Sequence, residues 1–309
     1  MTSLPKNRCS SCDSDRTKQL HLRENLIYNV CLTCRHCEKN VVEGSSTEAA
    51  FEESQENYYG EDSAILQVDL SPFVVEVLRT RSKMLQSYLP PKGTILEVGP
   101  GSGAVLGWMI AQGHIPTAIE HSPSLSKHLA NHYDIPVRSG EFTALELEKN
   151  TFDAFCSFHV IEHVSDPFAH LQRAFEIVRP GGVAFVATPN ANSWEQSIPG
   201  NLSPNFDSAH LRVFSKASLC KLAEETGWQI DQTTTPEFTI EWLRVLSKIL
   251  RRIKGEHEES TAGKYAGGSS SEMQWTFRTV HILSWPFRAL QASLGGGNEL
   301  FFVLRKPTI

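Results

Sequence analysis

Short apolar runs alternate with amphipathic stretches along most of the chain. Continuous apolar runs predict buried strands, and apolar positions three or four residues apart predict helices. The predicted strands cover residues 94–98, 117–120, 135–142, 152–158, 183–188, 228–234 and 299–305. The predicted helices cover residues 71–88, 104–112, 124–133, 167–178 and 216–226. Strands that alternate with helices in this way predict an α/β fold with a mostly parallel sheet.

Two further helices are predicted before the last strand. Residues 238–254 place leucine and isoleucine at helical spacing, together with five lysine or arginine residues. A helix of this kind can lie on an anionic membrane surface, or it can pack on the protein with its charges in water. We favour the packed helix. Residues 275–294 form the second apolar helix, which we expect to be broken near Pro286.

A glycine-rich turn with the sequence GPGSG follows the first predicted strand. Gly99, Gly101 and Gly103 give the backbone the freedom that a tight turn needs, and they let a ligand lie directly on the main chain. The free N–H groups of the next helix point at that ligand. The spacing also fits a dinucleotide-binding turn, but Glu97 would repel a pyrophosphate. A cationic aminoacyl sulfonium tolerates this carboxylate, so the turn favours such a ligand.

A second informative block covers residues 151–182. The sequence HVIEHV follows its strand, at the carboxyl end, where open α/β sheets bind ligands. Together with the motif E-x-G-x-G-x-G, this block resembles class I S-adenosylmethionine (SAM)-dependent methyltransferases. The resemblance is to the small-molecule branch that contains the ubiquinone O-methyltransferases, and it covers about residues 70–235 plus the terminal strand.

This resemblance implies a Rossmann-like, doubly wound, mostly parallel seven-stranded sheet whose last strand is inserted antiparallel beside the sixth. It also implies SAM as the cofactor, bound by the following residues: Glu97, Gly99, Gly101, Gly103, Glu120, Glu141, Phe142 and His159. Glu120 would accept hydrogen bonds from both ribose hydroxyls, because a carboxylate offers two acceptors to a vicinal diol. Glu141 replaces the aspartate of the family, so either its side chain or the Phe142 backbone would contact the adenine.

Methyl transfer from a sulfonium depends on alignment of the reactants and requires no metal for its chemistry. A hydroxyl acceptor needs a base, and we predict catalytic roles for His210 and His163, with His210 the favoured base. Carbon and nitrogen acceptors need no such base. The presence of these histidines therefore favours O-methylation. Residues 188–214 are long and polar, and we expect them to form one wall of the acceptor pocket. The side chains expected to face this pocket are Trp194, Phe206 and His210.

Five of the seven cysteines fall within the first 37 residues. Two C-x2-C pairs, Cys9 with Cys12 and Cys31 with Cys34, have the spacing of a four-cysteine zinc site around a small hairpin. Four thiolates fill a tetrahedral ion, so the predicted zinc is structural. The alternatives are iron at the same site or a cysteine-rich leader that binds no metal. Two neighbouring residues are also of ligand type: His36 and Cys37. The segment resembles the zinc-ribbon start of one group of bacterial methyltransferases that act on sugars and other small metabolites.

Composition limits the class of protein. The chain has 309 residues, of which 40% are hydrophobic and 21% charged, as in a globular domain with appendages. Its net charge of −6 argues against a general nucleic-acid binder. We found neither a membrane-spanning apolar run nor an apolar signal region, so we expect a cytoplasmic protein, membrane-associated only through its amphipathic helices. The expected parts are a zinc-ribbon-like segment at 1–40, a linker at 41–70, a methyltransferase domain at 71–235 with 296–309, and a helical insertion at 236–295.

Three functions fit the sequence. The favoured one is SAM-dependent methyl transfer to a small-molecule acceptor, such as a sugar, a natural product or a quinone-like or lipid-like intermediate. An NAD-linked oxidoreductase fits Gly99-x-Gly101-x-x-Ala104 but conflicts with Glu97. A binding module, in which the ribbon holds RNA or protein and the other domain senses SAM, fits the basic helix at 238–254 but conflicts with the acidic net charge.

Overall fold

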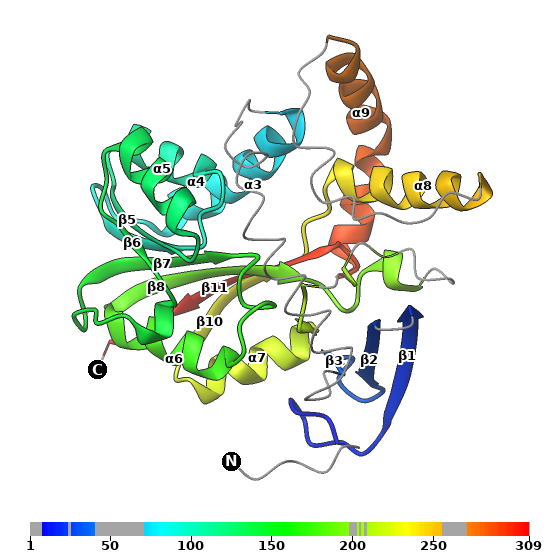
Figure 1. Cartoon of the computed structure of the whole chain (residues 1–309), viewed down its shortest axis with the longest axis horizontal. Coiled ribbons are helices and arrows are strands. Elements are labelled where there is room, and N and C mark those ends of the chain that lie inside the picture. Colours follow the sequence, from blue (N-terminus) through cyan, green and yellow to red (C-terminus); the bar gives the residue numbers. More distant parts are fainter. Residues whose placement is uncertain are drawn as a thin grey trace.

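The computed structural model describes residues 8–23, 26–40, 71–197, 203, 205–206, 209–254 and 271–308. These residues form a seven-stranded sheet with helices on both faces, and a smaller four-stranded sheet beside it (Figure 1). The predicted linker at 41–70 lies outside the described residues.

The large sheet has the strand order β10-β11-β8-β7-β4-β5-β6. Its strands are β4 (Thr94–Val98), β5 (Ile115–Glu120), β6 (Val137–Ser139), β7 (Phe152–Phe158), β8 (Val178–Pro189), β10 (Gln229–Thr234) and β11 (Glu299–Arg305). Strand β11 runs antiparallel to both of its neighbours, while β4 to β8 pair in parallel. The predicted doubly wound sheet with an inserted last strand is therefore confirmed.

Helices cover the sheet in two layers. On one face lie α3 (Pro72–Tyr88), α4 (Ala104–Ala111) and α5 (Pro123–Tyr133), and on the other lie α6 (Pro167–Ile177) and α7 (Lys216–Glu225) (Figure 1). Four of these helices begin after a side chain that accepts a backbone N–H, and three of the four have proline in the first turn. The capping residues are Ser71, Ser122, Asp166 and Ser215.

The central strands are apolar because both faces of the sheet are covered. Every residue of β7 is buried, as a strand between two helical layers requires. Phe155 and Leu219 belong to the core beneath α6 and α7, whereas Leu85 and Phe185 belong to the core beneath α3 to α5. The sheet thus separates two continuous cores and fixes the strand ends that carry the site.

Three predicted element boundaries are wrong. Strand β6 is shorter than predicted, since Phe142 begins a 3-10 helix, η1 (Phe142–Ala144). Strand β8 already includes the predicted turn at 179–182. Helix α9 (Ser271–Ser293) continues through Pro286. A proline removes one backbone donor, which a long helix tolerates when the rest of its ladder is intact.

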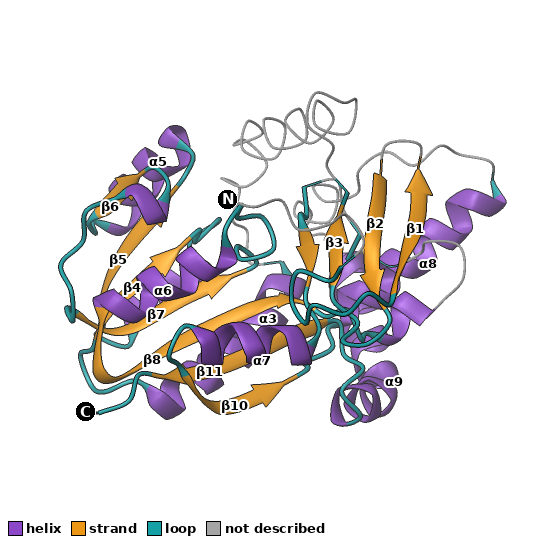
Figure 2. Ribbon diagram, turned by 90° about the horizontal axis from the view of Figure 1, so that it is seen from below, coloured by secondary structure: helices purple, strands orange, loops and turns teal. Residues whose placement is uncertain are grey.

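The small sheet joins the N-terminal segment to the long segment that follows β8. Strands β1 (Thr17–Arg23) and β2 (Leu26–Cys31) form the predicted hairpin, and β3 (Cys37–Lys39) follows. Strand β3 pairs with β9 (Arg212–Val213), which comes from the long segment after β8 (Figure 2). We call residues 8–40 the ribbon. Its sheet is completed by a strand that the sequence alone did not reveal.

Two helices project from the body at one end (Figure 1). Helix α8 (Thr239–Ile253) and helix α9 pack against α3 through a small apolar cluster. Phe73 and Phe277 lie edge to face in that cluster, with ring centroids 4.8 Å apart. None of the helices in the described ranges is long and apolar enough to cross a bilayer.

Candidate active site

The site is built at the carboxyl ends of β4 and β7, which are neighbours in the sheet. The turn after β4 is so close to the turn after β7 that a Cβ on Gly99 would lie 2.6 Å from Val160 Cγ2, and the φ of Gly99 is +64°. Gly101 also has a positive φ, and nothing lies within 4 Å of where its Cβ would be. The glycines therefore combine a close strand contact with an open backbone surface, which suits a ligand that lies on the main chain.

Glu97 is 2% exposed, and its Oε2 has no hydrogen-bond partner among the described residues. Burial raises the pKa of Glu97 to about 8, although the charge of Arg81 acts in the opposite direction. A buried, unsatisfied carboxylate is costly unless a partner completes it. An ammonium group, such as that of an aminoacyl cofactor, is the partner that this oxygen suits.

Glu97 should couple cofactor binding to pH. Below its pKa the carboxyl is mostly protonated, and a bound ammonium group favours the carboxylate, so binding releases a proton. We expect SAM affinity to rise with pH by up to about tenfold per unit between about pH 6 and 7.5. Glu97→Gln should abolish this slope, whereas the exposed Glu148→Gln should keep it. Calorimetric titration in buffers of different ionisation enthalpy measures the proton release, and an unchanged slope in E97Q would refute the coupling.

The other predicted cofactor residues lie around the same strand ends. Glu120 is 4% exposed at the end of β5, and its Oε1 accepts the Ser122 N–H at 3.1 Å. Phe142 is buried at the start of η1, and Glu141 beside it is exposed. The exposed Glu141 side chain and the backbone of the buried Phe142 both remain predicted contacts of the adenine.

His159 lies between two buried carboxylates. Its Nε2 is 2.7 Å from Glu299 Oε2 and its Nδ1 is 3.2 Å from Glu162 Oε1. Burial alone would lower the pKa of His159, but the hydrogen bonds and charges of these two glutamates raise it to about 9. Arg81 completes the set by pairing with Glu299 at 2.9 Å. The imidazolium thus binds the turn after β7 to strand β11, and both of its ring nitrogens are engaged with carboxylates.

His163 and His210 meet beside Glu162. Their ring centroids are 4.8 Å apart. His163 Nδ1 is 2.9 Å from the Ala209 carbonyl oxygen, and His210 Nδ1 is 2.9 Å from the Asn205 carbonyl oxygen. A carbonyl only accepts, so each Nδ1 carries a proton and Nε2 is the basic atom of the neutral ring. The structure brings together two histidines that are 47 positions apart in the sequence.

Glu162 is the residue around which these histidines gather, and it was not among the predicted site residues. It is fully buried and accepts Thr188 Oγ1–H at 3.0 Å. Burial would raise its pKa, but the His159 hydrogen bond and the surrounding histidines lower it to about 2. One ligand atom each from Glu162, His163 and His210 lie within 4.8 Å of one another, so this set can also hold a metal ion. The position of Glu162 in the sequence HVIEHV, directly after a predicted strand, was the signal that could have identified it as a site residue.

The long segment that carries His210 is held by the ribbon. Tyr28 Oη–H donates to the His210 carbonyl oxygen at 2.7 Å, and Lys39 N–H donates to Leu211 O at 2.8 Å. Phe206, which we expected to face the acceptor, instead packs on Tyr28 with ring centroids 5.0 Å apart. Trp194 lies against Phe287 of α9. The long segment after β8 is therefore supported from outside the large sheet.

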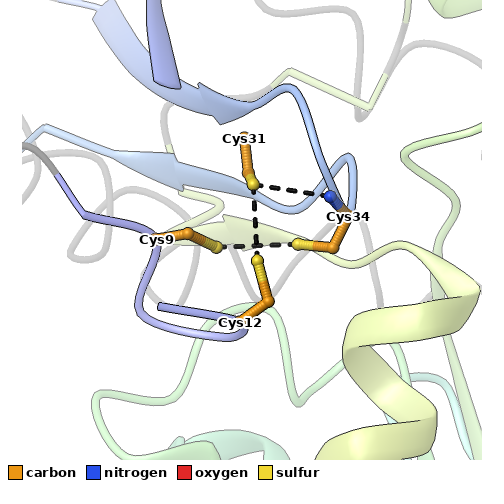
Figure 3. Close-up of side chains that lie close together, drawn as sticks. All are labelled: Cys9, Cys12, Cys31 and Cys34. Atoms are coloured by element: carbon orange, nitrogen blue, oxygen red, sulfur yellow. Dashed lines mark hydrogen bonds between the residues drawn. The ribbon is translucent and has the colours of Figure 1, made fainter. Parts of the chain in front are cut away.

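Four cysteine sulfurs of the ribbon converge (Figure 3). The Sγ atoms of Cys9 and Cys34, and those of Cys12 and Cys31, are each 3.6 Å apart, too far for a disulfide. A tetrahedral ion with Zn–S bonds of about 2.3 Å needs sulfurs about 3.8 Å apart, so the set fits a zinc site. The two other residues of ligand type, His36 and Cys37, lie outside this set. The His36 ring packs at a tilt against Phe214, and the Cys37 thiol donates to a backbone carbonyl.

The glycine turn after β4 and the strand order of the large sheet have the arrangement of class I methyltransferases. A model of the methyltransferase domain family matches residues 74–233, which is more than half of the chain. The chain belongs to this family. The chain contains a class I SAM-dependent methyltransferase domain, and SAM is the cofactor that the family implies.

Curated relatives agree over part of their length. A probable S-adenosylmethionine-dependent methyltransferase of Mycolicibacterium smegmatis is 28% identical over 140 residues, which are 45% of this chain and 53% of that protein. A ubiquinone biosynthesis O-methyltransferase of Caulobacter vibrioides is 36% identical over 103 residues, which are 31% of this chain and 41% of that protein. The match thus spans about half the length of these relatives.

Solved structures share the fold at low sequence identity. The 1,6-didemethyltoxoflavin-N1-methyltransferase of Burkholderia thailandensis has a TM-score of 0.52 and 13% identity, covering 94% of this chain and 99% of that chain. Phosphoethanolamine N-methyltransferase 2 of Haemonchus contortus has a TM-score of 0.52 and 15% identity, covering 91% and 63%. These similarities establish the architecture of this methyltransferase.

Proposed function

We propose that this methyltransferase transfers the methyl group of SAM to a hydroxyl group of a small-molecule acceptor. The observation that carries the proposal is the pair His163 and His210, whose Nδ1 atoms are held by backbone carbonyls so that Nε2 is the basic atom. A hydroxyl needs such a base when the methyl group arrives, whereas a carbon or nitrogen acceptor does not. The ubiquinone O-methyltransferase relatives support the same choice.

The cofactor side is assigned to the turn after β4 and its neighbours. When bound, SAM supplies an activated methyl group on a sulfonium. Glu97 would bind the ammonium group and Glu120 the ribose hydroxyls. The backbone of Gly99, Gly101 and Gly103 would face the cofactor, and Glu141 or Phe142 its adenine. His159 is assigned a place at the methionine end.

The acceptor side is assigned to His210, with His163 beside it. In this proposal His210 Nε2 takes the hydroxyl proton as the new bond forms, and the anionic Glu162 stabilises the resulting imidazolium. His159 cannot take this role, because both of its nitrogens are engaged by Glu162 and Glu299. We assign the chain four parts, as the sequence indicates: ribbon, linker, methyltransferase domain and the helical insertion at 236–295.

The test is label transfer from methyl-labelled SAM into a fractionated cell extract. Label in the aqueous small-molecule phase would assign a sugar or another polar metabolite, and label in the organic phase would assign a quinone-like or lipid-like acceptor. Identification of the labelled product as a methyl ether would support oxygen. Label in an N-methyl or C-methyl product would contradict the hydroxyl assignment.

His210→Gln should lower the rate of this transfer by about a hundredfold or more, since general base catalysis contributes factors of that size. SAM affinity should be unchanged, because His210 lies on the acceptor side. The matched control is His21→Gln, an exposed histidine of β1. Full activity in H210Q would remove His210 as the base while leaving SAM-dependent transfer itself in place.

The two other functions that the sequence allowed have less support. Family membership leaves the NAD-linked alternative without a supporting observation. The binding-module alternative predicts SAM binding without turnover on every extract fraction, so the same label-transfer experiment decides it.

A further inference from the structure

Large hydrophobic side chains are exposed mainly on α8 and α9. Of the fourteen in the described residues, ten lie on these helices or directly after α9. The most exposed are Ile253 and Leu283, each at 76%, and Trp275 at 71%. Soluble proteins usually expose such residues singly, so this concentration indicates a contact surface. We call it the α8–α9 surface.

The exposed residues form rows along each helix. On α9, Trp275, Ile282 and Leu290 are seven and eight positions apart and therefore share a face. On α8, Leu250 and Ile253 are three positions apart and share another. These helices are also bound to the enzyme by buried side chains elsewhere on them, such as Val245, Phe277 and Arg288. The exposed rows are thus distinct from the residues that hold the helices in place.

The charge of this surface is the opposite of that of the chain. Helices α8 and α9 together with Lys254 contain seven of the 29 lysine and arginine residues and two of the 35 aspartate and glutamate residues, Glu241 and Glu272. Two of the seven cations are paired with acids, since Arg288 is buried against Glu76 and Arg244 pairs with Glu241. Lys254 and Arg278 are exposed there. A partner that fits must offer negative charge together with an apolar interior.

We propose that the α8–α9 surface docks on an anionic phospholipid membrane. Helices with leucine and tryptophan on one face and lysine or arginine on the other bind at the boundary between headgroups and acyl chains. Each cation near an anionic leaflet adds to this attraction, which salt weakens. The proposal concerns binding and does not depend on the acceptor of the methyl group.

A second copy of the chain fits this surface less well. A two-fold contact places the same patch on both copies, so the cations of one α8–α9 surface would meet those of the other. An anionic bilayer supplies both the countercharge and the apolar phase.

The experiment is flotation of the full chain with vesicles of phosphatidylcholine, with and without phosphatidylglycerol. We expect binding to the anionic vesicles, weakened by salt, and little binding to the neutral ones. Ile282→Glu with Leu283→Glu should lower the bound fraction by about tenfold or more. The matched control is Ile115→Glu, an apolar residue that is 58% exposed on β5, and it should bind like the wild type.

Lys254→Glu with Arg278→Glu should also lower binding by about tenfold and flatten its salt dependence. SAM binding by each variant confirms that it is folded. Absence of binding to anionic vesicles, or equal binding by the I282E/L283E variant, would overturn the proposal. So would a dimer in analytical ultracentrifugation that the I282E/L283E variant abolishes, because the surface would then belong to a second copy.

Discussion

Cys31→Ser is expected to lower methyl transfer by about a hundredfold while SAM affinity stays within about twofold of the wild type. We expect the four cysteines to bind a structural metal whose binding free energy holds a segment too short for its own core, and loss of one thiolate would weaken that site. The ribbon supports the segment that carries His210 through Tyr28 and the pairing of β3 with β9. The glycine turn after β4 is not part of the ribbon, so the variant should still bind SAM.

The measurements are metal content by elemental analysis, SAM binding by calorimetry and turnover by label transfer. Cys220→Ser on α7 is the matched control, since Cys220 is a half-buried thiol outside the cluster. A chelator strong enough to remove the metal should reproduce the C31S result, and added zinc should reverse it. Equal loss of SAM affinity and turnover would contradict a role confined to the acceptor side.

Arg81→Met is expected to lower the free energy of unfolding by about 1.5–3 kcal/mol, because it removes one of the two cationic partners of a buried carboxylate. Arg81 pairs with Glu299, which is 2% exposed and also binds His159. Removing the guanidinium leaves Glu299 with His159 alone. The Arg81–Glu299 pair joins α3 to β11, and Glu299 also binds His159 in the turn after β7. We therefore expect the substitution to destabilise all three elements.

Urea denaturation of R81M and wild type measures this difference. Arg79→Met is the matched control, because Arg79 is exposed two positions earlier on the same helix; its effect should be within about 0.5 kcal/mol. Equal stability of R81M and the wild type would show that the pair contributes no net stability. SAM binding by R81M should also shift, since the Arg81 charge holds down the pKa of Glu97.

The sequence predicted the sheet because its signals are local. Buried strands such as 152–158 read as unbroken apolar runs, and Ser122 or Asp166 followed by proline mark helix starts that the structure confirms. The contacts that build the acceptor side are not local. Nothing near Phe206 indicates that its ring packs on Tyr28, and nothing near Glu299 indicates that it pairs with Arg81.

The histidines illustrate the same division. His159 and His163 were found because they follow a strand end, which periodicity locates well. Their roles depend on Glu162, Glu299 and the carbonyl of Ala209, which tertiary structure brings to them. Pro286 is the opposite case, where a strong local signal for a break is outweighed by the rest of a long helix.

The pairing of β3 with β9 also has a consequence for synthesis. Its partners, Cys37 and Val213, are roughly 175 positions apart, so the ribbon leaves the ribosome long before its fourth strand exists. Bringing together two residues so far apart in sequence costs conformational entropy, and local contacts within the ribbon do not offset this cost. Until then the ribbon has only its hairpin, β3 and the predicted metal at its four cysteines to hold it. We therefore expect the yield of folded chain to rise with the supply of zinc during translation.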